Sequence, residues 1–261
     1  MKLALWQTLP QTQMDAALDA LEGAAQSAKG QGADLLVTPE MFLGGYNIGA
    51  DQVAVHAADA GPALDCLKSI AATHGLALIV GLALPGTPRP FNGCVAINAA
   101  GQEVARYHKT HLFGEVDQAQ FTAGAALSDV FELGGWKIAL AICYDVEFPE
   151  LTRALALNGA EIVITPTANM VPFDSINTRL VPARAEENGL YLAYCNYTGA
   201  EGQFTYNGLS CVAGPDGHDL ARAGTAEQML CATLDRAALQ QARQAQTHLK
   251  DRRPDLYGDL T

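Results

Sequence analysis

Short apolar segments alternate along this chain with longer segments of helical spacing, and this alternation constrains the fold more than any other sequence feature. Leu35–Val37 and 162–165 are apolar runs too short for a helix, which is typical of buried strands. The apolar residues between Met14 and Ala28 recur at helical spacing, and Gly30 or Gly32 is expected to end that helix. Such alternation predicts an α/β fold with layers of helices and strands.

The same patterns give the expected elements in order. We expect strands over residues 2–7, 35–37, 76–84, 95–98, 103–107, 136–142, 162–165, 191–197, 209–213 and 229–234. We expect helices over residues 14–28, 62–75, 148–157, 177–188 and 236–246. The Ala100–Gly101 turn joins two of the strands as a hairpin, so the sheet is not expected to be purely parallel.

No linker, internal repeat or low-complexity tract divides the chain. We therefore expect residues 1–261 to form one domain. Its last part, 247–261, is charged and rich in turn residues. Such a tail either frays or packs on a partner subunit.

Charge and composition exclude several classes of partner. The 28 Asp and Glu residues outnumber the 16 Lys and Arg, and a net charge of −12 repels nucleic acid and anionic lipid. No apolar run approaches the length of a membrane span, and the apolar N-terminus is too short for a signal sequence. The six cysteines lack framework spacing, which is typical of reduced thiols. We expect a cytoplasmic protein with no nucleic-acid or membrane partner.

A carboxylate, an amine and a thiol each follow an expected strand: Glu40, Lys109 and Cys143. A thiol is mostly protonated at neutral pH, so attack on a carbonyl carbon needs a base and a cation that holds the developing oxyanion. Glu40 can serve as the base and Lys109 as the cation. Taken singly, Glu40 could cap a helix, Lys109 could be a solvated cation and Cys143 a buried structural thiol.

The segment around Cys143 favours a role in chemistry. The apolar strand before it and the Pro149 helix after it place the thiol at a strand-to-helix bend, as in the nucleophile elbow of serine hydrolases. Backbone N–H groups at such a bend, here that of Tyr144, can point at an oxyanion. His108 and His111 lack a third ligand nearby, so no metal site and no cofactor are expected.

Four segments together resemble the nitrilase, or carbon–nitrogen hydrolase, superfamily. They are residues 39–42 (PEMF), 108–114 (HKTHLFG), 143–150 (CYDVEFPE) and 166–170 (PTANM). The resemblance covers essentially the whole chain. It implies a Glu40–Lys109–Cys143 triad on a four-layer α-β-β-α sandwich. It also implies subunits that pair, as a homodimer or higher homo-oligomer, through the helices after the cysteine and through C-terminal tails.

Within the superfamily, residues 40–49, 109–115 and 249–256 resemble bacterial aliphatic amidases such as 5-aminopentanamidase and R-stereoselective amidase. The family commonly has a second glutamate shortly after the lysine. Spacing to Phe121 and Gly124 puts Asp117 at that position, one methylene shorter, and Glu115 is the alternative. The sequence does not decide between them.

The pocket wall is expected near the motifs. The substrate-binding candidates are Tyr46, Tyr144, Glu147, Asn169, Met170 and Phe173. A substrate with an ω-ammonium group would need a carboxylate in that wall, and Glu147 or Asp145 could provide it. Glu147 could instead cap the helix that follows it.

The sequence therefore predicts a cofactor-independent amidase that hydrolyses a small aliphatic amide, such as an ω-amino amide, to a carboxylic acid and ammonia. A nitrilase or an N-carbamoyl hydrolase is the alternative, because the same three groups serve each of these reactions. A catalytically silent binding protein on the same fold would be free to lose Glu40, Lys109 or Cys143, and all three are present.

Overall fold

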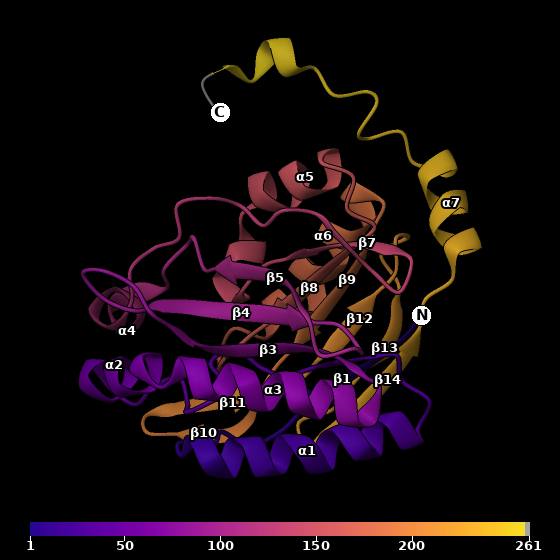
Figure 1. Ribbon diagram of the computed structural model, residues 1–261. Coiled ribbons are helices and arrows are strands. Elements are labelled where there is room, and N and C mark those ends of the chain that lie inside the picture. Colours follow the sequence, from indigo (N-terminus) through magenta and orange to yellow (C-terminus); the bar gives the residue numbers. More distant parts are fainter. Residues whose placement is uncertain (259–261) are drawn as a thin grey trace.

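In the computed structural model, which describes residues 1–258, two six-stranded sheets pack face to face (Figure 1). The first sheet contains, in spatial order, β14 (Gln228–Thr233), β1 (Lys2–Gln7), β2 (Leu35–Val37), β3 (Ala77–Leu84), β4 (Phe91–Ile97) and β5 (Glu103–His108). The second contains β13 (Asp219–Arg222), β12 (Cys211–Ala213), β9 (Tyr191–Cys195), β8 (Ile162–Pro166), β7 (Trp136–Leu140) and β6 (Phe131–Leu133). A separate hairpin is formed by β10 (Thr198–Glu201) and β11 (Phe204–Asn207).

Both sheets have the same pattern of strand pairing. The central pairs β1–β2 and β2–β3 of the first sheet are parallel, as are β7–β8 and β8–β9 of the second. The flanking pairs in each sheet are antiparallel. The expectation of a sheet that is not purely parallel is confirmed, and the hairpin around Gly101 joins β4 to β5.

Helices cover the outer face of each sheet. Along the first sheet lie α1 (Met14–Gly30), α2 (Ala50–Ala58) and α3 (Ala60–His74), and along the second lie α5 (Pro149–Leu157) and α6 (Val181–Asn188) (Figure 1). Alternate residues of a strand point to opposite faces. In β1, Ala4 packs toward α1 while Leu3 and Leu5 pack toward the second sheet. The predicted four-layer α-β-β-α sandwich is confirmed.

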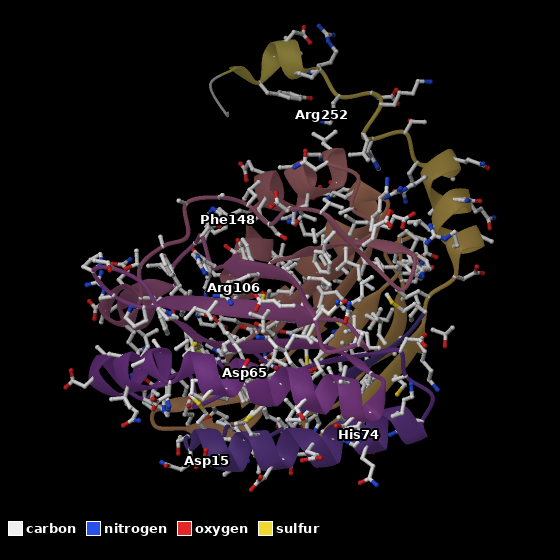
Figure 2. The ribbon with its side chains drawn as sticks, viewed as in Figure 1. Asp15, Asp65, His74, Arg106, Phe148 and Arg252 are labelled. Atoms are coloured by element: carbon white, nitrogen blue, oxygen red, sulfur yellow. The ribbon has the colours of Figure 1, made fainter. Side chains whose placement is uncertain are left out.

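Three buried clusters separate the four layers. The middle cluster joins the inner faces of both sheets through residues such as Val37, Ile79, Ile138 and Ile164. Its apolar side chains fill the space between the sheets, whereas charged side chains such as Asp15 and Asp65 lie on the outer faces of the helices (Figure 2). Burial between two apolar sheet faces is the main force that fixes the sheets against each other.

Most expected element boundaries match the structure. Gly75 ends α3 in the left-handed conformation, φ 56°, and Pro149 begins α5 at a position where no backbone N–H is needed. The region expected as one helix over 177–188 is a π-helical turn, Ile176–Leu180, followed by α6.

Several short elements were not expected. Helices α2 and α4 (Gly114–Gln120) and strands β6, β10, β11 and β13 are absent from the sequence-based assignment. Strands β6 and β13 are short edge strands, and the β10–β11 hairpin is separate from both sheets. Their polar, partly exposed residues lack a clear period because only part of each strand is buried.

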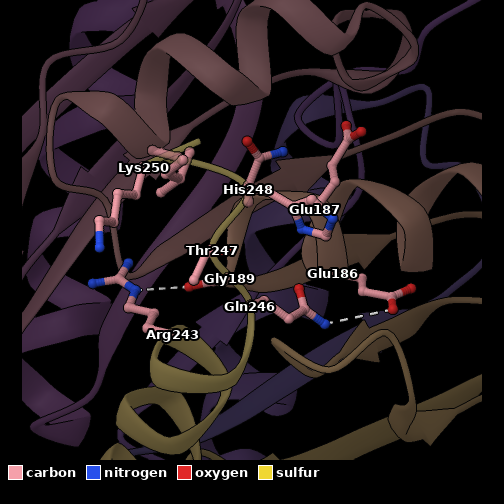
Figure 3. A pocket seen from close by; sticks show the side chains of 11 residues that line it. Glu186, Glu187, Gly189, Arg243, Gln246, Thr247, His248 and Lys250 are labelled. Atoms are coloured by element: carbon pink, nitrogen blue, oxygen red, sulfur yellow. Dashed lines mark hydrogen bonds between the residues drawn. The ribbon is translucent and has the colours of Figure 1, made fainter. Parts of the chain in front are cut away.

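The C-terminal segment leaves the body of the protein after α7 (Arg236–Ala245) (Figure 1). At its root, Arg243 Nε donates to the carbonyl of Gly189 at 2.8 Å, and Gln246 Nε2 lies 3.5 Å from Glu186 Oε1 (Figure 3). Beyond this anchor, the segment reaches a short turn of 3-10 helix, Pro254–Leu256, where Leu256 is 67% exposed. The predicted tail spans 247–261, and its last three residues lie outside the described residues.

Within residues 1–258, no helix combines the length and the apolar character that crossing a bilayer would need.

Candidate active site

The three predicted reactive residues come from the ends of strands in two different sheets. Glu40 follows β2 and Lys109 follows β5 in the first sheet, whereas Cys143 follows β7 in the second. The loop that carries Glu40 crosses β3 so closely that a Cβ at Gly81 would lie 2.5 Å from the carbonyl oxygen of Pro39. Glycine at this position therefore lets the Glu40 loop reach the space between the sheets.

Lys109 is the centre of a buried ionic cluster. Its Nζ lies 2.7 Å from Glu40 Oε1 and 2.7 Å from Asp117 Oδ2, and all three side chains are fully buried. Buried charges are tolerated only when they are paired and hydrogen-bonded, because desolvation of each ion is costly. The cluster carries two carboxylates and one ammonium group, so one negative charge is left over.

Burial and charge shift the pKa values of this cluster in defined directions. Burial raises the pKa of Glu40, with Asp117 adding to the rise and Lys109 opposing it. Burial alone would lower the pKa of Lys109, but the adjacent carboxylates of Asp117 and Glu40 outweigh it and raise the pKa. Lys109 is therefore a permanent cation, while Glu40 binds a proton more readily than an ordinary glutamate.

Cys143 begins a short 3-10 helix, Cys143–Glu147, directly after the strand. Its backbone has a positive φ of 47°, a conformation that non-glycine residues rarely adopt and that recurs at functional sites. Burial and the charge of Glu40 raise the pKa of the thiol, while Lys109 lowers it. The thiol is therefore protonated at rest and needs a base before it can act as a nucleophile.

The sulfur faces a small cavity of about 40 Å³. The cavity is lined by Tyr46, Phe113, Cys143, Glu147, Ala168, Asn169, Met170 and Phe173. Phe173 is 41% exposed, so the cavity borders solvent on that side. Its other walls are mostly aromatic or apolar, which suits a small organic ligand with few polar groups.

The cavity contains five of the six residues predicted to bind substrate. Tyr144 is the exception, because its ring packs edge-on against Phe113 and Phe148 instead of lining the wall. Phe113 and Ala168 line the cavity but were not proposed from the sequence. Both lie within segments that resemble the family, 108–114 and 166–170, and this position in the sequence could have indicated that they line the cavity.

Hydrogen bonds hold two walls of the cavity in place. The carboxylate of Glu201 on β10 accepts hydrogen bonds from the backbone N–H groups of Tyr46, at 2.9 Å, and Asn47, at 2.8 Å. The backbone N–H of Asn169 donates to Asn196 Oδ1 at 2.8 Å. Both partners come from distant parts of the chain, so no local pattern identified them.

The second acid is placed by helix α4. Asp117 is fully buried, and its Oδ2 also accepts a hydrogen bond from the backbone N–H of Phe113 at 2.8 Å. Glu115, two residues earlier, is exposed on the same helix. The alternative that Glu115 takes this position is therefore wrong for this structure, because the helix turns its side chain toward solvent.

Asp145 does not belong to the pocket wall. Its fully buried carboxylate accepts hydrogen bonds from the Tyr107 and Thr110 hydroxyls, the His111 backbone and the Ile142 backbone, all between 2.9 and 3.0 Å. His111 Nδ1 lies 2.8 Å from the same carboxylate. Asp145 therefore ties the Lys109 segment to the Cys143 segment.

Glu147 does line the cavity, and its side chain makes no capping hydrogen bond with α5. Burial raises the pKa of its carboxyl group, against the opposing effects of Lys109 and Arg184. Arg184 also donates to the carbonyls of Val146, at 3.1 Å, and Glu147, at 2.9 Å. The α6 helix thereby fixes the turn that carries both Cys143 and Glu147.

The two histidines near Lys109 have separate surroundings. His108 stacks on Phe91 with ring centroids 4.1 Å apart, and His111 stacks on Phe148 at 4.0 Å. Among residues 1–258, no three or more His, Cys, Asp or Glu side chains gather in a way that could hold a metal ion.

One polar residue beside Glu40 was not predicted from the sequence. Asn92 on β4 is fully buried and donates from Nδ2 to Glu40 Oε1 at 2.7 Å. A polar side chain within the otherwise apolar stretch of β4 is the signal that could have found it.

Comparison with known proteins decides the family. The model of the family described as carbon–nitrogen hydrolase matches residues 2–244. The chain belongs to the carbon–nitrogen hydrolase family. A protein described as a hydrolase in the pqqF 5′ region of Pseudomonas protegens is 44% identical, over 100% of this chain and 92% of the relative.

Two further similarities connect this carbon–nitrogen hydrolase to amidases. An (R)-stereoselective amidase from a Pseudomonas species is 35% identical over 87% of this chain and 82% of the relative. A crystal structure of an amidase from a Nesterenkonia species is 36% identical, with a TM-score of 0.91, over 100% of this chain and 96% of that one. A glutamate-to-glutamine variant of the Nesterenkonia enzyme carries acrylamide, added by Michael addition, at its active-site cysteine.

The position of Asp145 in this carbon–nitrogen hydrolase leads to a test by Asp145→Asn. The amide has one acceptor oxygen where the carboxylate has two, so buried donors from the Lys109 and Cys143 segments lose their partner. We expect the free energy of unfolding to fall by about 3 kcal/mol, measured by urea denaturation. Asp19→Asn, at an exposed position of α1, is the control and should change stability by less than about 0.5 kcal/mol. Equal stability of the two variants would contradict a tying role for Asp145.

Proposed function

We propose that this carbon–nitrogen hydrolase is an amidase that converts a small aliphatic amide to a carboxylic acid and ammonia through a thioester on Cys143. One observation carries the proposal: Glu40 and Lys109 form a buried ion pair at 2.7 Å, and the charges of both act on the Cys143 thiol, which lines a small, largely apolar cavity. A base, a cation and a nucleophile in one buried place are the groups that attack on an amide carbon requires.

In the first step, Glu40 takes the proton from Cys143 as the sulfur bonds to the amide carbon. Burial raises the pKa of both groups, so the thiol stays protonated until a substrate is present and Glu40 is a stronger base than an ordinary carboxylate. The carbonyl electron pair moves onto oxygen. That oxyanion is held by the ammonium group of Lys109 and by the backbone N–H of Tyr144.

In the second step, the tetrahedral intermediate collapses. The C–N bond breaks, Glu40 returns its proton to the leaving nitrogen, and ammonia departs. A water molecule then gives a proton to Glu40 and attacks the thioester carbon. The C–S bond breaks, the sulfur regains a proton, and the carboxylic acid is released.

The comparisons support this class of reaction. Relatives of this chain are named as amidases, and a structural neighbour holds the acetamide group of fluoroacetamide, covalently added at its active-site cysteine. All six cysteines of the present chain are free thiols, which agrees with the proposal that the enzyme acts in the reducing cytoplasm.

Replacing the nucleophile tests the mechanism. Cys143→Ala should fold with an unchanged melting temperature but release ammonia from aliphatic amides only at background rate, because no thioester can form. Cys231→Ala is the matched control, since Cys231 is also a partly exposed free thiol but lies on β14. Mass spectrometry of the wild-type enzyme mixed with an amide should show one acyl group, and peptide mapping should place it on Cys143.

A panel of substrates would distinguish an amidase from a nitrilase, an N-carbamoyl hydrolase and a silent binding protein. It contains aliphatic amides, the matching nitriles and N-carbamoyl amines, with ammonia release as the readout. Faster turnover of a nitrile or a carbamoyl compound than of every amide would overturn the amidase proposal. Release of no ammonia from any of them, with Cys143 unreactive toward iodoacetamide, would indicate a silent binding protein.

We further propose that the substrate carries an ω-ammonium group, as in 5-aminopentanamide, and that Glu147 binds it. Among the described residues that line the cavity, Glu147 is the one carboxylate, and Asp145 is already occupied by five donor groups. A charge-assisted contact in a largely apolar site would favour a cationic substrate over a neutral one.

Glu147→Gln tests this assignment. The change removes the charge but keeps the shape, so kcat/KM for 5-aminopentanamide should fall about 10- to 100-fold while that for pentanamide stays within about twofold. Glu150→Gln, at an exposed position of α5, is the control for a change in net charge. An equal effect of Glu147→Gln on both amides would contradict a role in recognising the ammonium group.

We also propose that the chain forms a homodimer or a larger homo-oligomer through α5, α6 and the C-terminal segment. Leu157 on α5 is 48% exposed, and Leu256 on the segment is 67% exposed. Leu249, near the start of the segment, packs on the buried cluster of α5 and α6, and beyond it the segment leaves the body (Figure 1). Apolar side chains on an extended segment favour docking on a second copy.

Sedimentation velocity tests the assembly. The wild-type protein should sediment as a dimer or larger, and removal of residues 247–261 or the change Leu256→Asp should shift it toward monomer. Val55→Asp is the control, because Val55 is 52% exposed on α2, which covers the other sheet. A wild-type monomer at micromolar concentration would refute the proposal.

A further inference from the structure

Each oxygen of the Glu40 carboxylate has different surroundings. Oε1 accepts two hydrogen bonds, from Lys109 Nζ and from Asn92 Nδ2, each at 2.7 Å. Oε2 is buried and has no hydrogen-bond partner among the described residues. A carboxylate oxygen that accepts two short hydrogen bonds is less basic than its free neighbour, so a proton would bind to Oε2.

Asn92 is connected to both charged residues of this cluster. Its side chain donates to Glu40, and its backbone carbonyl accepts from the backbone N–H of Lys109 at 2.8 Å. Asn92 is fully buried and does not line the cavity. It therefore acts on the reacting atoms only through Glu40 and Lys109.

Stability alone does not account for an asparagine at this position. Its Oδ1 is buried without a partner in the described chain, and such an orphaned acceptor costs about 1–3 kcal/mol. A leucine of similar shape would avoid this cost, and Glu40 Oε1 would keep its bond to Lys109. The polar side chain is therefore better explained by its effect on Glu40.

We propose that Asn92 is a positioning residue that occupies Oε1 of Glu40 and thereby makes Oε2 the atom that exchanges protons with Cys143 and the leaving group. This inference rests on the proposed amidase function. It assigns to the β4 strand a part in the reaction, although β4 contributes no side chain to the cavity.

The surroundings of Glu40 determine the direction of its pH dependence. Among the described residues, the ionic or nucleophilic groups that interact electrostatically with Glu40 are Lys109, Asp117 and Cys143. The remaining titratable groups that feel its charge are neutral at physiological pH, because burial raises their pKa values: Cys94, Tyr46, Tyr194, Tyr197 and Tyr206. The Asn92 hydrogen bond lowers the pKa of Glu40, so its loss would raise that pKa further.

The experiment compares the wild-type enzyme with Asn92→Leu. A base must be unprotonated, so activity is present above the pKa of Glu40 and lost below it. We expect the acid limb of kcat/KM to move up by about one pH unit and kcat at pH 7 to fall about tenfold or more, with KM nearly unchanged. Asn188→Leu is the matched control, because Asn188 is also a fully buried asparagine with one side-chain bond and an orphaned oxygen.

A second readout keeps this test independent of the amidase assignment. The rate at which iodoacetamide alkylates Cys143, followed by mass spectrometry against pH, reports proton transfer from the thiol to Glu40. Its acid limb should shift upward in Asn92→Leu as well. Should that variant fail to fold by circular dichroism, Asn92→Ala carries the same expectation.

The possible outcomes are distinct. An acid limb that stays unchanged in both readouts would overturn the role of Asn92. The same conclusion would follow if Asn92→Leu lost kcat without a shift of the acid limb and Asn188→Leu lost kcat to the same extent. If the wild-type enzyme hydrolyses no amide but the alkylation limb still shifts, the proposed function fails and the role of Asn92 at Glu40 stands.

Discussion

The ionic contact between Lys109 and its two carboxylates is the interaction on which the site depends. Three charged side chains lie fully out of contact with water, and each would be unstable there without the others. The chain brings them together from the end of β2, the end of β5 and helix α4. Because a buried unpaired charge is so costly, the correct folding of these three segments and the formation of the site are one event.

The net negative charge of the cluster, which comes from its second carboxylate, lets the cluster act as a base. A single Lys109–Asp117 pair would satisfy both ions, but Glu40 adds a second carboxylate and burial raises its pKa. Burial raises the pKa of the Cys143 thiol as well, so both partners of the proton transfer favour their protonated forms. The site therefore holds the base Glu40 next to the protonated Cys143 thiol. The proton moves to Glu40 only when the sulfur attacks a substrate.

The arrangement of the two sheets places the nucleophile. Glu40 and Lys109 belong to the first sheet and Cys143 to the second, so the reaction takes place across the interface between sheets. Asp145 spans this interface by binding the strand-end segments of both. Arg184 on α6 holds the turn after Cys143 from the other side. Apolar packing in the middle layer fixes the approximate distance, and these polar contacts fix the orientation.

The alternating elements, the three strand-end residues and the family to which they point could all be predicted from the amino-acid sequence, because each depends on local spacing or on a contiguous motif. It left open whether Asp117 or Glu115 reaches Lys109 and whether Glu147 or Asp145 gives the pocket wall its carboxylate, and it placed Tyr144 in the pocket. The tertiary structure decided these points, since the turn of α4 exposes Glu115 and five donor groups converge on Asp145 from separate segments. It also revealed Asn92, Phe113 and Glu201. A residue's partners depend on which strands and loops pack together, and that information is spread over the whole chain.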